Sequence, residues 1–321
     1  MLDVLAAKKT GNKWAKRKKT LLLISMVAPG AIWLILLRYL PMIGIVVAFQ
    51  KYKIYSKAPS LLNNIIHSQF NGLGNFKFLF KTTDSLKMIR NTLLYNICWI
   101  ILMLVVAVTF AIMINEITQK LVAKTYQTLM FFPYFLSWVV VSYFVLAFLD
   151  PTSGLLTNLQ KSLGQVPTRW YNDPKPWPFI LTITNLWKGL GYSSILYLAT
   201  ITGISASQYE AASIDGASKW QQVIHVTLPH LRPMILLLFI ISIGKVFNAD
   251  FGLFYTVPMD SGPLYPVTQV IDTYVYRALM ATGGDVGMST AASLFQNAVG
   301  FLFLMGANQI VKKIDEESSL F

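Results

Sequence analysis

Six apolar stretches alternate with polar segments along the chain, and each is long enough to cross a bilayer. A membrane-spanning helix needs about 20 mainly apolar residues. The stretches cover residues 21–49, 93–114, 126–149, 179–203, 234–257 and 288–311. Because they lack the period-two alternation of barrel strands, helices are the expected element. The pattern predicts an all-α polytopic membrane protein with six transmembrane helices.

Charges near the N-terminus indicate the orientation in the membrane. Residues 1–20 hold one acid, Asp3, and seven basic residues, Lys8, Lys9, Lys13, Lys16, Arg17, Lys18 and Lys19. Basic segments beside a span favour the cytoplasmic side, and six spans return the C-terminus to that side. Residues 50–92 also carry seven basic residues, which weakens this signal. We expect a basic cytoplasmic tail (1–20), a transmembrane domain (21–312) and a cytoplasmic C-terminal tail (313–321).

Composition supports a membrane protein and argues against a nucleic-acid-binding one. Of the 321 residues, 55% are hydrophobic and 13% are charged, which is too apolar for a soluble domain of this size. The net charge of +13 suits a polyanionic partner. A basic tail next to a span, however, more often sets topology and attracts anionic lipid. We therefore expect contact with membrane lipid and none with nucleic acid.

Candidate catalytic chemistry is sparse in this sequence. Cys98 is the only cysteine, which excludes disulfides and cysteine metal sites within the chain. The histidines do not have the spacing of a zinc site; they are His67, His225 and His230. No phosphate-binding loop is present, because Gly244-Lys245 is followed by Val246. We expect no catalytic residue, metal or cofactor in this chain, so that any ATP and Mg²⁺ would be bound by a partner.

Residues 206–232 form a polar segment between the fourth and fifth apolar stretches. Ser207 and Glu210 have the spacing of a capping box, which predicts a helix that starts near Gln208. Gly216 is expected to turn the chain at positive φ and to let another group approach closely. Pro229 is expected to end the element that follows Gly216. A segment built in this way is typical of a docking surface.

This segment also resembles the cytoplasmic signature loop of permease subunits in bacterial ABC importers. The resemblance rests on Glu210-Ala211-Ala212, then Gly216 after three residues, then Val226-x-Leu228-Pro229 after nine more. Val226 is the one departure, because isoleucine is usual there. The alternative is an ordinary amphipathic connector on the membrane surface. Such a connector would not need the glycine and the Leu-Pro pair at these offsets.

Other stretches resemble the branch of these importers that handles oligosaccharides or polysaccharides. They are residues 41–50, 74–76, 91–93, 270–277 and 307–309. The resemblance covers most of the chain after residue 20 and implies a type I ABC importer permease fold in a bacterial inner membrane. It also implies a second, related permease, two ATPase subunits, and a periplasmic or surface-tethered solute-binding protein. The chain would then be a transport subunit and not an enzyme.

In that family the 206–232 loop couples the spans to an ATPase. By resemblance, the coupling residues are Glu210, Ala211, Ala212, Asp215 and Gly216, with Leu228 and Pro229 completing the signature. Small alanines allow close packing, and the two carboxylates accept hydrogen bonds or pair with basic groups. Glu210 has two expected roles of equal weight, helix capping and coupling to the ATPase.

Ionisable residues within the apolar stretches indicate a substrate pathway, since each costs about 2.5 to 3.5 kcal/mol at the bilayer centre. Lys188, Lys245 and Asp250 are such residues. The full candidate set adds aromatic and amide neighbours: Trp187, Lys188, Tyr192, Lys245, Asn248, Asp250, Gln296 and Asn297. Alternatively, Lys245 and Asp250 pair with each other, although a five-residue offset is poor for a helical pair. Gln296 and Asn297 either share the site or bridge helices.

These observations predict one subunit of an ATP-driven importer for oligosaccharide or polysaccharide. The lysines favour an acidic, alginate-like cargo, because a uronate carboxylate is attracted to buried ammonium groups. One alternative is a permease of the same class for a neutral sugar or glycerol phosphate. Another, from a different class, is an ion-coupled secondary transporter or a membrane-embedded enzyme.

Overall fold

The computed structural model describes residues 13–53, 60–81, 83–280, 284–316 and 319–320. The chain divides into two compact units, Met1–Asn75 and Phe76–Phe321. Residues 1–12 of the expected basic tail lie outside the described residues. The remainder of that tail, from Lys13, already belongs to the first helix, which therefore begins before the expected boundary at residue 20.

The first unit is one long helical rod followed by a short polar segment. Its elements are α1 (Lys13–Leu34), the π-helical η1 (Ile35–Tyr39), the 3₁₀-helical η2 (Leu40–Phe49), β1 (Gln50–Lys51), α2 (Leu61–His67) and β2 (Gln69–Phe70). β1 and β2 pair antiparallel, with Gln50 opposite Phe70. The Asn75 amide donates to the carbonyls of Ala48 at 3.0 Å and Gln50 at 2.8 Å, which fixes the chain where the rod ends. The fold is therefore helical with one small two-stranded ladder, which the expected all-α class did not include.

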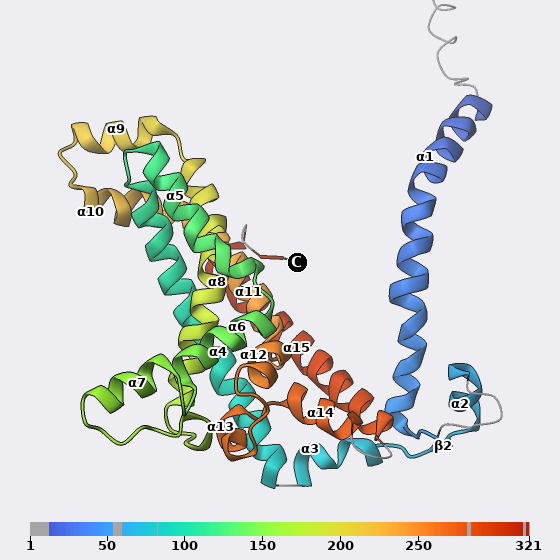
Figure 1. Ribbon diagram of the computed structural model, residues 1–321. Helices are drawn as coiled ribbons and strands as arrows, with labels where there is room; N and C mark the ends of the chain where they lie inside the picture. Colours follow the sequence, from blue (N-terminus) through green and yellow to red (C-terminus); the bar gives the residue numbers. More distant parts are fainter. Residues whose placement is uncertain (1–12, 54–59, 82, 281–283, 317–318, 321) are drawn as a thin grey trace, which may run out of the picture. The chain divides into compact units, whose positions relative to one another are not determined.

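The second unit consists of helices in the part of the chain that the structure describes. The longer ones are α4 (Thr83–Asn115), α5 (Lys120–Phe131), α6 (Trp138–Leu149), α8 (Trp177–Thr202), α11 (Leu228–Gly244) and α15 (Val286–Ile314). The shorter ones are η3 (Gly74–Phe76, across the unit boundary), α3 (Phe78–Lys81), η4 (Phe132–Phe135), α7 (Leu155–Ser162), η5 (Trp170–Asn172), α9 (Ala206–Ile214), α10 (Lys219–Gln222), η6 (Val223–Thr227), α12 (Phe251–Thr256), η7 (Gly262–Leu264), α13 (Tyr265–Thr268) and α14 (Ile271–Met280). In Figure 1, α9 and α10 lie at one end of this unit, and α3, α7 and α13 lie at the other.

Four helices among the described residues are long and apolar enough to cross a membrane, and a bent pair makes a fifth candidate. The four cover Arg17–Phe49, Asp84–Asn115, Lys219–Gly244 and Val286–Ile314. The 26-residue α8 has the necessary length, at about 1.5 Å per residue, but carries several polar side chains. The protein is therefore a helical, polytopic membrane protein.

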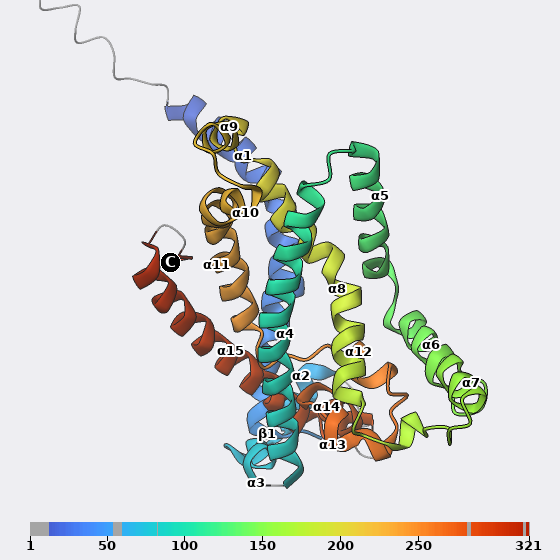
Figure 2. The same cartoon turned by 90° about the vertical axis from the view of Figure 1, so that its left-hand side faces the viewer.

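The third apolar stretch is bent and not a straight span. Lys120–Phe135 and Trp138–Leu149 meet at 101°. Pro133 lies in the 3₁₀ turn η4, where it removes a backbone donor, and Ser137 caps α6 by accepting from the Val140 N–H. We call residues 132–137 the bend. Figure 2 shows α5 and α6 as separate segments with this bend between them. The connection between α4 and α5 is short, because α4 ends at Asn115 and α5 begins at Lys120.

The fifth apolar stretch is interrupted. α11 ends at Gly244, residues 245–250 are not helical, and α12 begins at Phe251 with Asp250 as its cap. We call residues 245–250 the break. Lys245, Asn248 and Asp250 therefore lie on irregular backbone and not on a helix.

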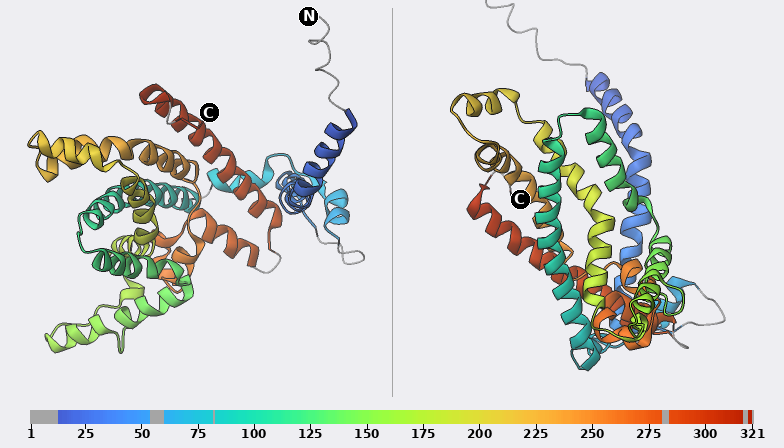
Figure 3. Two further views of the ribbon diagram at one scale, coloured as in Figure 1. Left: turned by 90° about the horizontal axis from the view of Figure 1, so that it is seen from above. Right: turned by 60° about the vertical axis from the view of Figure 1, so that its left-hand side comes forward.

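The core of the second unit forms where α4 packs along α8 (Figure 3, teal beside yellow-green in the right-hand view). Ala107 and Ala111 on α4 are fully buried against Tyr197 of α8 and Leu231 of α11. Small residues of this kind let helix backbones approach closely, which drives helix association where burial from water is not available. This helix pair contacts both irregular segments, because α8 packs against η4 in the bend and Asn96 of α4 bonds to the break.

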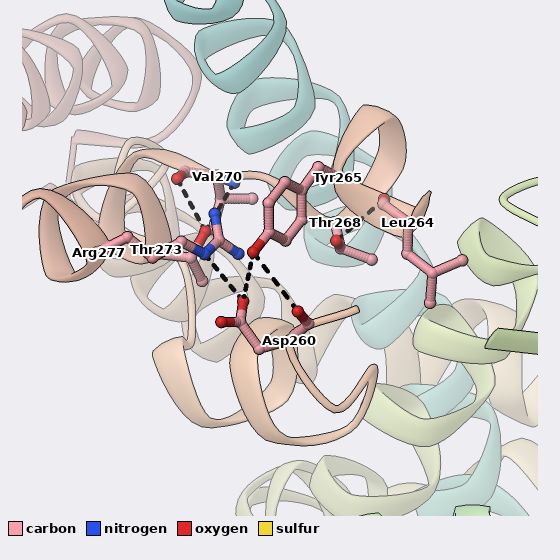
Figure 4. A network of polar contacts seen from close by, with 7 residues as sticks. All are labelled: Asp260, Leu264, Tyr265, Thr268, Val270, Thr273 and Arg277. Carbon is pink, nitrogen blue, oxygen red and sulfur yellow. Dashed lines mark hydrogen bonds and ion pairs between the residues drawn. The ribbon is translucent and has the colours of Figure 1, made fainter. Parts of the chain in front are cut away.

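A polar network holds the segment between α12 and α14 (Figure 4). Arg277 Nε donates to Asp260 Oδ1 at 2.8 Å, and the guanidinium lies 3.9 Å from the centre of the Tyr265 ring. Met259 and Asp260 have positive φ angles of 56° and 46°, which are costly for residues other than glycine. The ion pair and the stacked ring stabilise this strained turn against α14. The stretch 270–277 lies in α14, apart from Val270.

Candidate functional site

The 206–232 loop is a helix, a glycine turn and a second helix. α9 starts at Ala206 after Ser205, so Ser207 lies inside the first turn and does not cap it; the expected capping box there is wrong. A capping box forms instead one helix later. Ser218 Oγ accepts from the Gln221 N–H at 3.4 Å, and the Gln221 side chain accepts from the Ser218 N–H at 2.7 Å. Glu210 therefore has no capping serine with which to form the expected capping box.

Gly216 makes the turn with φ of 80°, as predicted. A side chain at this position would meet no atom of this chain within 4 Å. Glycine is therefore required by the backbone conformation, because a residue with a Cβ is strained there. The open space around it leaves room for another molecule to approach.

Internal hydrogen bonds fold the loop onto itself. Gln222 Nε2 donates to Ser213 Oγ at 2.9 Å, and the hydroxyls of Tyr209 and Thr227 lie 3.0 Å apart. An ion pair of 3.2 Å joins Lys219 to Glu116 in the turn before α5. These contacts orient the α9 helix relative to α4 and α11.

The signature residues form an exposed face beside a groove. Glu210, Ala211 and Asp215 are exposed, and Ala212 is half-buried. The groove has a volume of about 690 Å³, and its lining includes Asn115, Glu116, Tyr209, Glu210, Ile214 and Lys219. Two large apolar side chains project here that the sequence analysis did not single out. Ile214 is 86% exposed and Trp220 is 70% exposed. Their positions on either side of Gly216 could have indicated them from the sequence.

Pro229 does not end a helix, contrary to expectation. α10, η6 and α11 run on as one helical segment, Lys219–Gly244. Val223–Thr227 is π-helical, and the Leu228 N–H bonds to the Val223 carbonyl. A proline ring normally collides with the carbonyl four residues earlier, and the wider π turn relieves that conflict. Leu228 and Pro229 are thus the first residues of α11.

Lys188 lies in a cationic, aromatic site at the bend. Its ammonium donates to the Tyr134 carbonyl at 2.8 Å and lies 5.5 Å and 5.2 Å from the ring centres of Tyr134 and Trp138. Tyr192 stacks on Tyr134, with ring centres 4.7 Å apart. Both tyrosines are more than two-fifths exposed. The site therefore presents aromatic faces and a cation to open space.

Asp250 closes this site from the break. Its Oδ2 accepts from the Trp138 indole at 2.8 Å, and its Oδ1 accepts from the Leu253 N–H at 3.3 Å. Lys188, Tyr192 and Asp250, three of the candidate pathway residues, lie together in this site. Tyr134 and Trp138 were not among the candidates; their positions on either side of the capping Ser137 within an apolar run could have indicated them.

Two glycines pack closely against the residues at the two ends of the bend. A Cβ at Gly191 would collide with the Met130 and Phe131 backbone, and a Cβ at Gly252 would collide with the Trp138 ring. α8 and α12 therefore approach the residues that flank the bend as closely as glycine permits.

Side chains from three helices satisfy the backbone of the break. Asn96 Nδ2 donates to the carbonyls of Val246 at 2.9 Å and Asn248 at 3.1 Å. Gln296 Nε2 donates to the Phe247 carbonyl at 2.7 Å. Asp272 Oδ2 accepts from the Ala249 N–H at 2.9 Å. Unpaired backbone groups at membrane depth cost several kcal/mol each, so these contacts allow the break to exist.

Several expected pathway residues have other positions. Gln296 is 3% exposed and also donates to Asp272 at 3.0 Å, so it bridges helices. Asn297 is exposed and donates to Ser293 of its own helix. Trp187 lines an apolar groove against α6, away from the Lys188 ring contacts. In the part of the chain that the structure describes, no ion pair joins Lys245 to Asp250, and Lys245 and Asn248 are exposed.

The Gln296→Leu variant should lower the stability of the protein by about 1–3 kcal/mol, because the Phe247 carbonyl loses its donor at similar side-chain volume. Asn297→Leu is the matched control, since the Asn297 amide donates to the Ser293 carbonyl of its own helix. The measurement is the thermal unfolding midpoint of each variant purified in the same detergent. Equal midpoints for the two variants would contradict the bridging role.

No group of three or more metal-binding side chains occurs among the described residues. The Lys188 site holds one ammonium group, aromatic rings and the Asp250 carboxylate. Such an arrangement can bind and guide a polar solute.

Comparison with known proteins gives the family. Residues 103–314 match the family described as the inner membrane component of binding-protein-dependent transport systems. The chain is 33% identical over 312 residues to the polygalacturonan/rhamnogalacturonan transport system permease protein YteP of Bacillus subtilis (strain 168). That alignment covers 95% of this chain and 94% of the relative.

Two solved structures agree with this assignment. One is a bacterial ABC transporter involved in the import of the acidic polysaccharide alginate; it matches with a TM-score of 0.81 and 31% identity over 94% of this chain and 99% of that one. The other is a bacterial alginate ABC transporter in complex with an alginate pentasaccharide-bound periplasmic protein; its TM-score is 0.82 and its identity 30%, over 94% and 97% of the two chains. In such transporters the permease has no catalytic centre or cofactor of its own, and nucleotide belongs to the ATPase subunits. The chain is a member of the binding-protein-dependent transport family, a multi-pass inner membrane permease component of an ABC importer.

Proposed function

We propose that this chain is one of two related permease subunits of an importer that moves an acidic oligosaccharide or polysaccharide across the inner membrane. It would work with two ATPase subunits and a periplasmic or surface-tethered solute-binding protein. The bent third stretch and α8 complete six spans, with both termini in the cytoplasm. This orientation places the 206–232 loop in the cytoplasm and α7 and α13 on the outer side.

The observation that carries the cargo assignment is the site around Lys188. Its ammonium contacts neutral carbonyls and ring faces, with no carboxylate bonded to it among the described residues. A uronate carboxylate would form a stronger, charge-assisted bond than a carbonyl does. The exposed rings of Tyr134 and Tyr192 offer flat apolar faces for sugar rings. The oxygens of Asp250 accept from the Trp138 indole and the Leu253 N–H, which leaves the Lys188 ammonium without a bond to this carboxylate among the described residues.

The relatives support the same chemistry. One is named for polygalacturonan, which is a polymer of uronate residues, and the matching structures import alginate, an acidic polysaccharide. This agrees with the acidic cargo and with an alginate-type importer. A neutral sugar or glycerol phosphate is the alternative within the family, whereas family membership leaves an ion-coupled secondary transporter without support.

We assign coupling to the exposed face of the 206–232 loop. Glu210, Ala211, Ala212 and Asp215 would contact an ATPase subunit, and the open space beside Gly216 would admit part of it. Leu228 and Pro229 begin α11, which leads directly to the break. Movement of the docked loop would therefore reach Lys245, Asn248 and Asp250 through one helix.

The cargo is tested with matched substrates. The complete complex in proteoliposomes is supplied with a uronate oligosaccharide or with the same oligosaccharide after chemical reduction of its carboxyl groups. ATP-dependent uptake of the charged form should be at least about tenfold faster, which corresponds to about 1.4 kcal/mol of discrimination. Equal uptake of both forms would overturn the acidic cargo. Uptake without ATP would overturn the coupling to an ATPase.

A further inference from the structure

A groove separate from the pathway runs along the outer part of α4. It has a volume of about 450 Å³. α4 contributes Arg90, Asn91, Leu94, Tyr95 and Cys98; Pro178 and Thr182 of α8 and Val267 of α13 complete it. Apart from the polar groups of Arg90 and Asn91 at one end, its lining is mostly apolar.

The exposed members of this lining form a stripe. Arg90, Leu94 and Cys98 are all exposed and are spaced four residues apart, so they lie on one face of α4. At about 1.5 Å per residue, the stripe extends about 12 Å from the guanidinium end. A cation at one end of an apolar track of this length matches a phosphate followed by an acyl chain.

The position of Arg90 along α4 places it at the outer interface. The cytoplasmic end of α4 is marked by Glu116, which pairs with Lys219 in the 206–232 loop. Arg90 is 26 residues before Glu116, or about 39 Å along a helix. This exceeds the hydrocarbon thickness of about 30 Å, so the guanidinium reaches the headgroup region while Cys98 lies within the apolar layer.

The surrounding charge also favours an anion. Residues 77–90 carry four exposed basic residues and one acid: Lys77, Lys81, Lys87, Arg90 and Asp84. Outer segments of inner membrane proteins are normally poor in lysine and arginine, so this excess is unusual for its side of the membrane. Lys87 is paired with Asp84 at 3.3 Å, whereas Arg90 donates only to the neutral Asn91 amide at 3.1 Å among the bonds of the described residues. Arg90 is thus the cation that faces the groove.

We infer that this groove binds an anionic phospholipid of the outer leaflet, with its phosphate at Arg90 and an acyl chain over Leu94 and Cys98. The inference rests on the orientation given with the proposed function and not on the cargo. Since α4, α8 and the segment after α12 all line the groove, a bound lipid joins three parts of the permease. Asn91 reinforces this junction, because its amide donates to the carbonyls of Pro266 and Gln269 at 3.1 Å.

The test uses the complete complex in nanodiscs that contain phosphatidylglycerol or phosphatidylcholine carrying a photoactivatable diazirine on one acyl chain. After illumination, peptide mapping quantifies adducts on residues 90–98. The phosphatidylglycerol probe should give at least about fivefold more adducts than the phosphatidylcholine probe. Arg90→Gln should abolish this preference, whereas Lys87→Gln, one turn away and outside the groove, should retain it.

Three results would overturn the inference. Equal labelling by both probes would show that the groove holds bulk lipid without selecting its charge. A preference that survives in Arg90→Gln would place the anionic headgroup elsewhere. Absence of adducts would show that a partner helix covers the groove. Each result is independent of saccharide transport, because no substrate is present. Failure of the acidic cargo in the uptake assay would leave this experiment unaffected.

Discussion

Replacing Gly216 with valine should detach the ATPase from this permease. The backbone there has φ of 80°, where a β-branched residue adds about 1–3 kcal/mol of strain. The new side chain would also fill the open space into which the ATPase is proposed to dock. We expect affinity between the subunits to fall by at least about tenfold and ATP-driven uptake to fall with it. Co-purification of the ATPase with tagged permease measures the first effect.

Gly164→Val provides the matched control for this prediction. Gly164 also has positive φ, 70°, and a Cβ there would meet no atom within 4 Å, but it follows α7 at the opposite end of the second unit. The control therefore carries similar backbone strain without altering the 206–232 loop. ATPase recovery that is the same in the two variants would refute the docking role of Gly216.

Lys188→Gln should remove most of the preference for a charged saccharide. Glutamine retains a donor for the Tyr134 carbonyl but loses the positive charge. A hydrogen bond to a charged group contributes about 1.5–3 kcal/mol, so the ratio of uronate uptake to uptake of the carboxyl-reduced sugar should fall by about 10- to 150-fold. The ratio is the useful measurement, because general damage to transport lowers both rates.

Two further variants locate the origin of that preference. Lys188→Arg keeps the charge and should keep a ratio above that of Lys188→Gln. Lys245→Gln removes an exposed cation from the break, outside the ring contacts of the Lys188 site, and should change the ratio less. If Lys188→Gln leaves the ratio unchanged, Lys188 does not select the cargo.

The sequence predicts the parts of this protein that depend on local pattern. The apolar stretches that mark a helical membrane protein and the turn at Gly216 follow from composition and spacing. The family follows from the signature loop, and the comparisons confirm it. These features need no knowledge of which distant residues meet.

The bend and the break depend on distant partners, and for that reason hydrophobicity does not reveal them. Pro133 sits in an aromatic run that has the composition of a continuous span. The break is tolerable only because Asn96, Asp272 and Gln296 supply its backbone bonds from three other helices. The same reason explains why Gln296 was grouped with the pathway, since a buried amide and a substrate ligand look alike in one sequence.

The close packing of Gly191 and Gly252 at the two ends of the bend has a mechanical consequence. Gly191 meets main-chain atoms of Met130 and Phe131, and Gly252 meets the ring of Trp138, so no long flexible side chain intervenes on either side. Close-packed contacts of this kind transmit displacement with little compliance. A shift of α8 would therefore move Met130 and Phe131, and with them the start of the bend, by a similar amount.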